Sequence, residues 1–228
     1  MKKTISAVLA LAMLAVMCYS GAKLRALDAE RRAEEHLHAE LLRQKPEEAS
    51  VNPLAGLREQ NPDIIGWINL PDTGIDYPIA QAKDNDYYLR RDLNGEPARP
   101  GTIFMDCRCA GDGSGYSIIY GHNMKSGSMF GPLQKFKDKD FFETHPEGRL
   151  LLEDGWHTLR FFAFLVVREN DAVLYNASPD DGFLENIAAR ALNYREPGIN
   201  DTDRVVTLST CSYAFRGARM ALVGVIVD

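Results

Sequence analysis

Short apolar segments recur along the chain from residue 51 onward, separated mostly by glycine, proline, aspartate or asparagine. They are rich in β-branched and aromatic residues, which favour strands over helices. Strands are predicted in this way at 75–80, 102–105, 117–120, 149–153, 159–167, 204–210 and 220–227. Many short strands at irregular spacing predict a mainly β protein, either a barrel or a sandwich.

Two helices are predicted within this β-rich part. The triplet Asn61-Pro62-Asp63 is predicted to cap a short helix over the apolar residues that follow it. Ser178 and Pro179 are typical of a helix start, because serine caps a helix and proline fits its first turn. Apolar residues at helical spacing then predict a helix over about 179–194. It lies between two strong strands, so it is predicted to be an insertion that covers the sheet.

The first 22 residues are predicted to be a signal or a membrane anchor. Lys2 and Lys3 precede an apolar run over 5–17 that continues weakly to Ala22. A basic start followed by an apolar run is typical of a secretory signal, and the length is near the lower limit for a spanning helix. We favour an uncleaved anchor with its basic end in the cytoplasm and the rest outside. A cleaved signal is the alternative.

Residues 23–50 are predicted to be a helical spacer between the anchor and the body. They are rich in Ala, Leu, Glu and Arg, which are good helix formers, and Pro46 stops the pattern. His36 and His38 lie two apart on this solvated helix and do not face each other, so we expect surface residues and no metal site.

Composition and charge narrow the range of possible functions. The chain has 228 residues, of which 45% are hydrophobic and 25% charged, so it can build a packed core. From residue 51 onward there are 18 basic and 25 acidic side chains, which disfavours nucleic-acid binding. The four cysteines, at 18, 107, 109 and 211, are too few for a disulfide scaffold.

Three chemically useful side chains stand at predicted strand ends. Cys211 ends the strand over 204–210 and opens a loop, His122 follows Gly121 after the strand over 117–120, and Arg219 opens the last strand. A thiolate nucleophile needs a proton acceptor or a cationic neighbour, and a tetrahedral acyl intermediate needs a donor for its oxyanion. These residues could fill those roles. Spacing alone leaves Cys211 either a nucleophile or a buried structural thiol.

Four separated segments resemble class B sortases in the expected order. They are TLSTC at 207–211 with Arg219 after it, YGHNM at 120–124 with SGSMFGPLQKF at 126–136, the stretch over 61–89, and GTIFMDCR at 101–108. The resemblance covers about residues 54–228. It implies an eight-stranded sortase-type β-barrel with N-terminal helices and a helix inserted before the cysteine strand, so that 51–228 would be the catalytic domain.

The resemblance also implies an activity, that of a cysteine transpeptidase on the outer face of a Gram-positive plasma membrane. Cys211 would attack the Thr carbonyl of a C-terminal sorting signal between Thr and Gly. His122 would act as acid and base, Arg219 would hold the oxyanion, and Thr210 with Ser209 would contact the signal. An amine of a cell-wall peptide or of its lipid-linked precursor would then take the surface protein. No cofactor is implied.

Several alternatives stay open. A pilin lysine could be the acceptor amine, or the chain could be an inactive sortase-like binding module on a membrane anchor. Ser212 stands where many class B members carry an acidic residue or threonine, and Arg216 is a second candidate arginine. Cys107 and Cys109 could belong to a zinc set with His122 and Cys211, or to a disulfide, but ordinary thiols are favoured. The GDGSG loop at 111–115 lacks the acid alternation of a calcium loop.

Overall fold

The computed structural model describes residues 2–47, 52–198 and 203–227, with residues 2–10 and residue 30 described by their backbone alone. The chain forms two compact units, Met1–Glu40 and Leu41–Asp228. The helix α1, Lys2–Arg43, accounts for the first unit and ends three residues before Pro46. Among the residues whose side chains are described, no helix is both long and apolar enough to cross a membrane. The predicted anchor lies partly outside those residues, so it stays a prediction.

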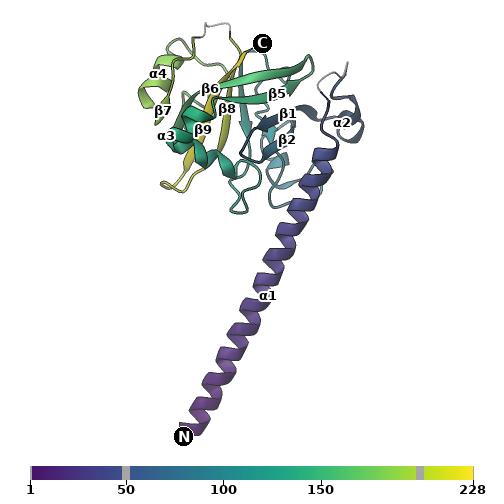
Figure 1. The fold of residues 1–228 in the computed structure, drawn as a ribbon, viewed down its shortest axis with the longest axis vertical. Helices are drawn as coiled ribbons and strands as arrows, with labels where there is room; N and C mark the ends of the chain where they lie inside the picture. Colours follow the sequence, from purple (N-terminus) through teal and green to yellow (C-terminus); the bar gives the residue numbers. More distant parts are fainter. Residues whose placement is uncertain (1, 48–51, 199–202, 228) are drawn as a thin grey trace. The chain divides into compact units, whose positions relative to one another are not determined.

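The second unit is a closed barrel of eight strands (Figure 1). In spatial order these strands are β5 (Glu147–Leu152), β1 (Ile64–Leu70), β2 (Ile75–Ala80), β3 (Phe104–Met105), β4 (Tyr116–Tyr120), β8 (Val205–Cys211), β9 (Ala218–Val227) and β6 (Gly155–Arg168). Pairing of β5 with β6 closes the ring. The short β7 (Asn193–Tyr194) adds to β6 outside the ring. The predicted eight-stranded, mainly β barrel is confirmed.

The interior of the barrel is apolar and aromatic. Phe161 and Phe164 of β6, Leu222 of β9 and Phe130 are fully buried. Short helical segments surround the barrel: α2 (Ala55–Gln60), α3 (Lys139–Thr144), and the 3₁₀ turns η1 (Tyr87–Arg90) and η2 (Gly131–Lys137). Most strand pairs are antiparallel, but β4 pairs with β8 in parallel, which places the ends of these two strands at the same rim.

The predicted helix after Asn61-Pro62-Asp63 is wrong, because this segment is the strand β1. Its isoleucines suit a pleated sheet, and it pairs with β2 on one side and β5 on the other. Asn61 ends the preceding helix α2, and its side-chain oxygen accepts from the backbone N–H of Asp63 at 2.8 Å. The polar cluster is therefore a turn between helix and strand.

The late helix is present but shorter than predicted. α4 spans Phe183–Arg190 and begins after Gly182, whose φ of +87° is left-handed, so Ser178 is not its cap. Phe183 and Ile187 are buried under it. The apolar periodicity continued to Leu192, but that side chain is 53% exposed, because the chain turns there into β7. As predicted, α4 is an insertion before the cysteine strand.

Candidate functional site

The strand order places the three predicted catalytic residues at one rim of the barrel. In the parallel pair of β4 and β8, Tyr120 lies opposite Ser209, and the N–H of Gly121 continues the ladder to the Ser209 carbonyl at 3.2 Å. His122 is therefore level with Cys211. In the antiparallel pair of β8 and β9, Cys211 lies directly opposite Arg219. The cysteine thus has a histidine strand on one side and an arginine strand on the other.

Arg219 contacts the cysteine sulfur. Its Nη1 donates to Sγ of Cys211 at 2.9 Å, and the Cys211 side chain is partly exposed. A guanidinium donor at the sulfur stabilises negative charge there and is placed to stabilise an oxyanion on an adjacent carbon. Arg219 Nη2 lies 3.7 Å from Oε2 of Glu169, which follows β6. Arg216 is exposed on the loop, so the structure brings Arg219 and not Arg216 to the thiol.

His122 is held by a backbone carbonyl. Its Nε2 lies 2.7 Å from the Leu89 carbonyl oxygen in η1, so Nε2 carries the proton and donates. This leaves Nδ1 as the nitrogen available for proton transfer. Within the described chain, the imidazole forms no hydrogen bond with Cys211. The next residue ties the two segments together, because Asn123 Nδ2 donates to the Cys211 carbonyl at 2.8 Å.

Gly121 is required for a reason that the sequence did not show. Its φ is not in the left-handed region, so the backbone conformation at this position does not itself require glycine. A Cβ at this position would instead lie 2.7 Å from the ring of buried Phe130. Phe130 in turn donates its N–H to the His122 carbonyl at 3.0 Å. Close packing against Phe130 therefore positions the histidine segment.

Thr210 and Ser209, which the resemblance assigned to substrate contact, are both buried. Ser209 Oγ pairs with the hydroxyl of Tyr175 at 2.8 Å. Thr210 Oγ1 has no hydrogen-bond partner within the described chain. Their contact with a signal stays a prediction.

A buried carboxylate behind the site was missed by the sequence analysis. Asp106 is fully buried, accepts two hydrogen bonds from the Arg108 guanidinium at 2.9 and 2.7 Å, and accepts from the Tyr120 hydroxyl at 3.0 Å. Burial alone would raise the pKa of Asp106, but hydrogen bonds from Arg108, Asn85 and Tyr120 outweigh it and lower the pKa to about 2. The sequence pattern that could have indicated this cluster is an acidic residue at the end of an apolar strand, followed two residues later by an arginine.

The same cluster fixes a loop beside the cysteine strand. Tyr175 stacks on Tyr120, with ring centroids 6.3 Å apart, and its carbonyl accepts from Arg108 at 3.2 Å. Burial raises the pKa of Tyr175 to about 12, so it stays a neutral hydrogen-bonding group. The cluster therefore connects the loop after β6 to Ser209, two residues before the thiol.

The remaining cysteines do not join the site. All four cysteines are free thiols, so the disulfide alternative for Cys107 and Cys109 is wrong. Cys109 is buried, and burial raises the pKa of its thiol. Among the described residues, no group of three or more histidine, cysteine or acidic side chains is arranged to hold a metal ion.

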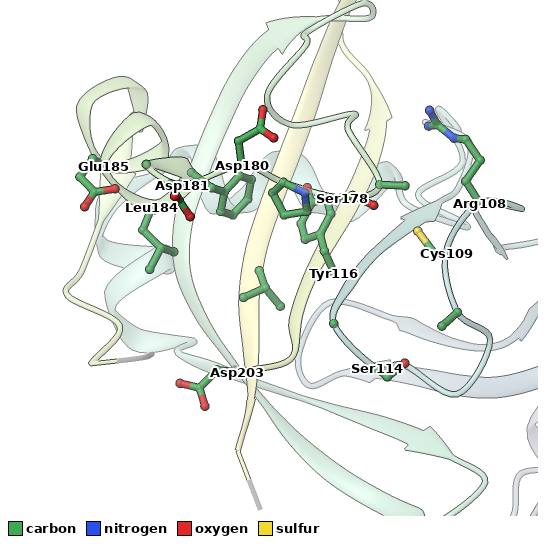
Figure 2. Close-up of a pocket in the computed structure, with 17 residues that line it drawn as sticks. Arg108, Cys109, Ser114, Tyr116, Ser178, Asp180, Asp181, Leu184, Glu185 and Asp203 are labelled. Carbon is green, nitrogen blue, oxygen red and sulfur yellow. The ribbon is translucent and has the colours of Figure 1, made fainter. Parts of the chain in front are cut away.

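A cavity of about 750 Å³ lies beside α4 and away from the thiol. Its lining includes Tyr116 and Val205, which begin β4 and β8, whereas His122 and Cys211 lie at the other ends of these strands. Figure 2 shows the acidic side chains of Asp180, Asp181 and Glu185 around it. This cavity is therefore separate from the cysteine site.

Comparison with known proteins gives consistent matches. Residues 68–227 match the family model described as the sortase domain. Sortase B of Listeria monocytogenes is 36% identical over an alignment of 183 residues that covers 76% of this chain and 74% of the relative. The crystal structure of sortase B from B. anthracis in complex with AAEK1 is 34% identical, with a TM-score of 0.77, over 88% of this chain and 99% of that one. A Streptococcus pyogenes class B sortase involved in pilus biogenesis is 31% identical, with a TM-score of 0.70, over 75% of this chain and 96% of that one.

Proposed function

The chain belongs to the sortase family, in its class B, whose members are cysteine transpeptidases, and on that premise we propose a specific reaction for it. It cleaves a C-terminal sorting signal between Thr and Gly and joins the surface protein to an amine of the cell wall. The acceptor is a wall peptide or its lipid-linked precursor.

The reaction follows from the positions of three side chains. The Cys211 thiol passes its proton to Nδ1 of His122, and Sγ attacks the Thr carbonyl carbon, whose oxygen becomes an oxyanion within reach of the Arg219 guanidinium. The C–N bond breaks as Nδ1 of His122 gives a proton to the leaving glycine amine, which leaves a thioester on Cys211. An acceptor amine then attacks the thioester and passes its proton to His122. The Leu89 carbonyl keeps Nε2 protonated throughout, so one nitrogen serves both transfers.

The observation that carries this proposal is the 2.9 Å contact from Arg219 Nη1 to the Cys211 sulfur, at the rim where Asn123 joins the histidine segment to the Cys211 backbone. An inactive binding module would have no need of these contacts. A purely structural thiol would be sealed from solvent, whereas Cys211 is partly exposed.

Replacing the nucleophile tests the proposal. We expect Cys211→Ala to lower cleavage of a fluorogenic sorting-signal peptide by about three orders of magnitude or more, with an unchanged unfolding curve, because one rim atom is lost. Cys107→Ala, at another partly exposed cysteine, is the matched control and should cleave normally. Appreciable cleavage by Cys211→Ala would contradict the assignment.

A pilin lysine is a second candidate acceptor, because one structural relative is a class B sortase involved in pilus biogenesis. The two acceptors can be separated with the purified chain, one signal peptide, and either a wall-type peptide amine or a pilin subunit. Mass spectrometry of the product shows which amine is joined to the signal.

We also propose that residues 1–22 anchor the chain in the plasma membrane, with 23–228 outside. Lys2 and Lys3 before the apolar run over 5–17 support this orientation. Protease added to intact, wall-stripped cells should then cut the body, and the chain should sediment with membranes. If the protease cuts only the purified protein, the orientation is wrong.

A further inference from the structure

A cavity of about 500 Å³ lies against the catalytic histidine. One wall is formed by residues 122–124, and the other by Arg90, residues 97–98 and Arg99. All of these lie in the barrel unit, at the end of η1 and in the loops that follow η1 and β4. The reaction described above uses His122 but assigns nothing to the space in front of it.

The cavity lies on the side of the thiol away from Arg219. β8 runs between β4 and β9, so the histidine segment and Arg219 flank Cys211 from opposite sides. Asn123, which lines the cavity, is hydrogen-bonded to the Cys211 carbonyl at 2.8 Å. A molecule in this cavity therefore lies beside the base that must take its proton, and Asn123 connects the cavity lining to the backbone of the residue that carries the thioester.

The ionisable groups that line this cavity are all basic. The lining contains two guanidinium groups and the imidazole, and no carboxylate. This contrasts with the body of the chain, in which acidic side chains outnumber basic ones. An exposed cationic cavity in an acidic body favours a ligand with an anionic group.

Arg90 is the residue best placed to bind such a group. Its side chain is exposed and forms no hydrogen bond or ion pair within the described chain. The neighbouring Arg91 differs, because its guanidinium donates to the Gly95 carbonyl at 3.1 Å and lies 5.2 Å from the centroid of the Tyr87 ring. Arg90 also directly follows Leu89, whose carbonyl holds His122. The segment that orients the base therefore also presents an available cation.

We propose that this cavity is the acceptor subsite, and that it takes a primary amine carrying an anionic group, either a carboxylate or a phosphate. This inference rests on the proposed transpeptidase function. The acceptor nitrogen attacks the thioester carbon, so a C–N bond forms and the C–S bond breaks. The sulfur leaves as a thiolate held by Arg219, and the surplus proton of the amine goes to Nδ1 of His122. Arg90 binds the anionic group and so keeps the amine near the carbonyl.

The test is an acceptor series with the full chain and one sorting-signal peptide. The acceptors are triglycine, triglycine amide and diglycyl-aminoethyl phosphate, which carry a carboxylate, no anion and a phosphate. We expect lower KM values for the charged acceptors than for the amide. Arg90→Gln should raise the KM of the charged acceptors about tenfold relative to the amide, the scale of one charge-assisted hydrogen bond. The charged acceptor with the lower KM shows whether the cavity prefers a carboxylate or a phosphate.

Two further variants make the result specific. Arg90→Lys keeps the charge and should retain most of the preference for charged acceptors. Arg91→Gln, whose side chain does not line the cavity, should leave all KM values unchanged. Equal KM values for charged and neutral acceptors, or the same effect from Arg91→Gln, would overturn the subsite. Because hydrolysis of the signal is followed without any acceptor, normal cleavage with no charge preference overturns only this inference. Absent cleavage overturns the proposed function and this subsite with it.

Discussion

The guanidinium of Arg219 has a different neighbour on each of its terminal nitrogens. Nη1 donates to the thiol, and Nη2 lies 3.7 Å from the Glu169 carboxylate. Ser212 offers no carboxylate beside the cysteine, so in this chain the acidic partner comes from the end of β6. Glu169 is 60% exposed, and exposed ion pairs are weak. The backbone pairing of Arg219 with Cys211 therefore does most of the positioning.

Arg219→Lys should lower kcat/KM for a sorting-signal peptide by roughly two orders of magnitude, about 2.7 kcal/mol, the scale of one oxyanion donor. A lysine ammonium is a single point charge and cannot replace a planar fork held between two partners. Arg216→Lys is the matched control and should change kcat/KM only slightly, because Arg216 is exposed on the loop. If Arg216→Lys is the damaging substitution, Arg219 does not have this role.

The close packing of Gly121 against Phe130 makes the histidine segment sensitive to one methyl group. An alanine Cβ would lie 2.7 and 2.8 Å from ring carbons of Phe130, so the ring or the backbone must move. We expect Gly121→Ala to cost about 1–3 kcal/mol of unfolding free energy by overpacking. Displacement of His122 should lower kcat/KM about tenfold or more, because acid–base catalysis depends on position. Urea unfolding and peptide cleavage measure the two effects.

Gly56→Ala provides the control for that substitution. A Cβ at Gly56 has no atom within 4 Å, and this glycine lies in the short helix α2. It should leave cleavage unchanged and raise stability slightly, since alanine favours helices. Cleavage by Gly121→Ala at the rate of the unchanged chain would show that His122 tolerates the shift.

Strands were predictable where β-branched and aromatic residues cluster, and contacts across strands were not. The strands that carry Cys211, Arg219 and the approach to His122 were all predicted from β-branched residues. β1 was missed because the polar residues before it also suit a helix cap. Only its pairing with β2 and β5 decides that the segment is a strand and not a helix. The Leu89 and Glu169 contacts join segments far apart in the chain, so local pattern carries no signal for them.

Ionisation of Asp106 makes the stability of the barrel depend on pH. Its pKa is about 2 in the folded chain, because hydrogen bonds from Arg108, Asn85 and Tyr120 outweigh burial, against an ordinary value of 3.8. A lowered folded pKa stabilises the fold above the unfolded pKa, and this stabilisation is lost as the pH falls from about 4 towards 2. We expect a loss of about 2 kcal/mol over that window. Urea unfolding from pH 5 to pH 2 measures it.

Asp106→Asn is the comparison that isolates this group. The variant has no carboxyl at this position to titrate. Between pH 5 and pH 2 its unfolding free energy should therefore fall by about 2 kcal/mol less than that of the unchanged chain. Its stability at pH 7 should also be lower, since Arg108 loses a buried charged partner. Equal acid dependence in both proteins would mean that other carboxyls control the acid response.

The strand order also sets the sequence of events during synthesis. β8 and β9 fill the gap between β4 and β6, yet they follow every other strand along the chain. Pairings between segments so far apart form slowly, and the sheet stays open until they form. A nascent chain that has emerged only as far as β6 contains His122 but neither Cys211 nor Arg219. Closure of the barrel and the appearance of a competent thiol are therefore one event, and a chain that ends at β6 has neither the nucleophile nor its arginine.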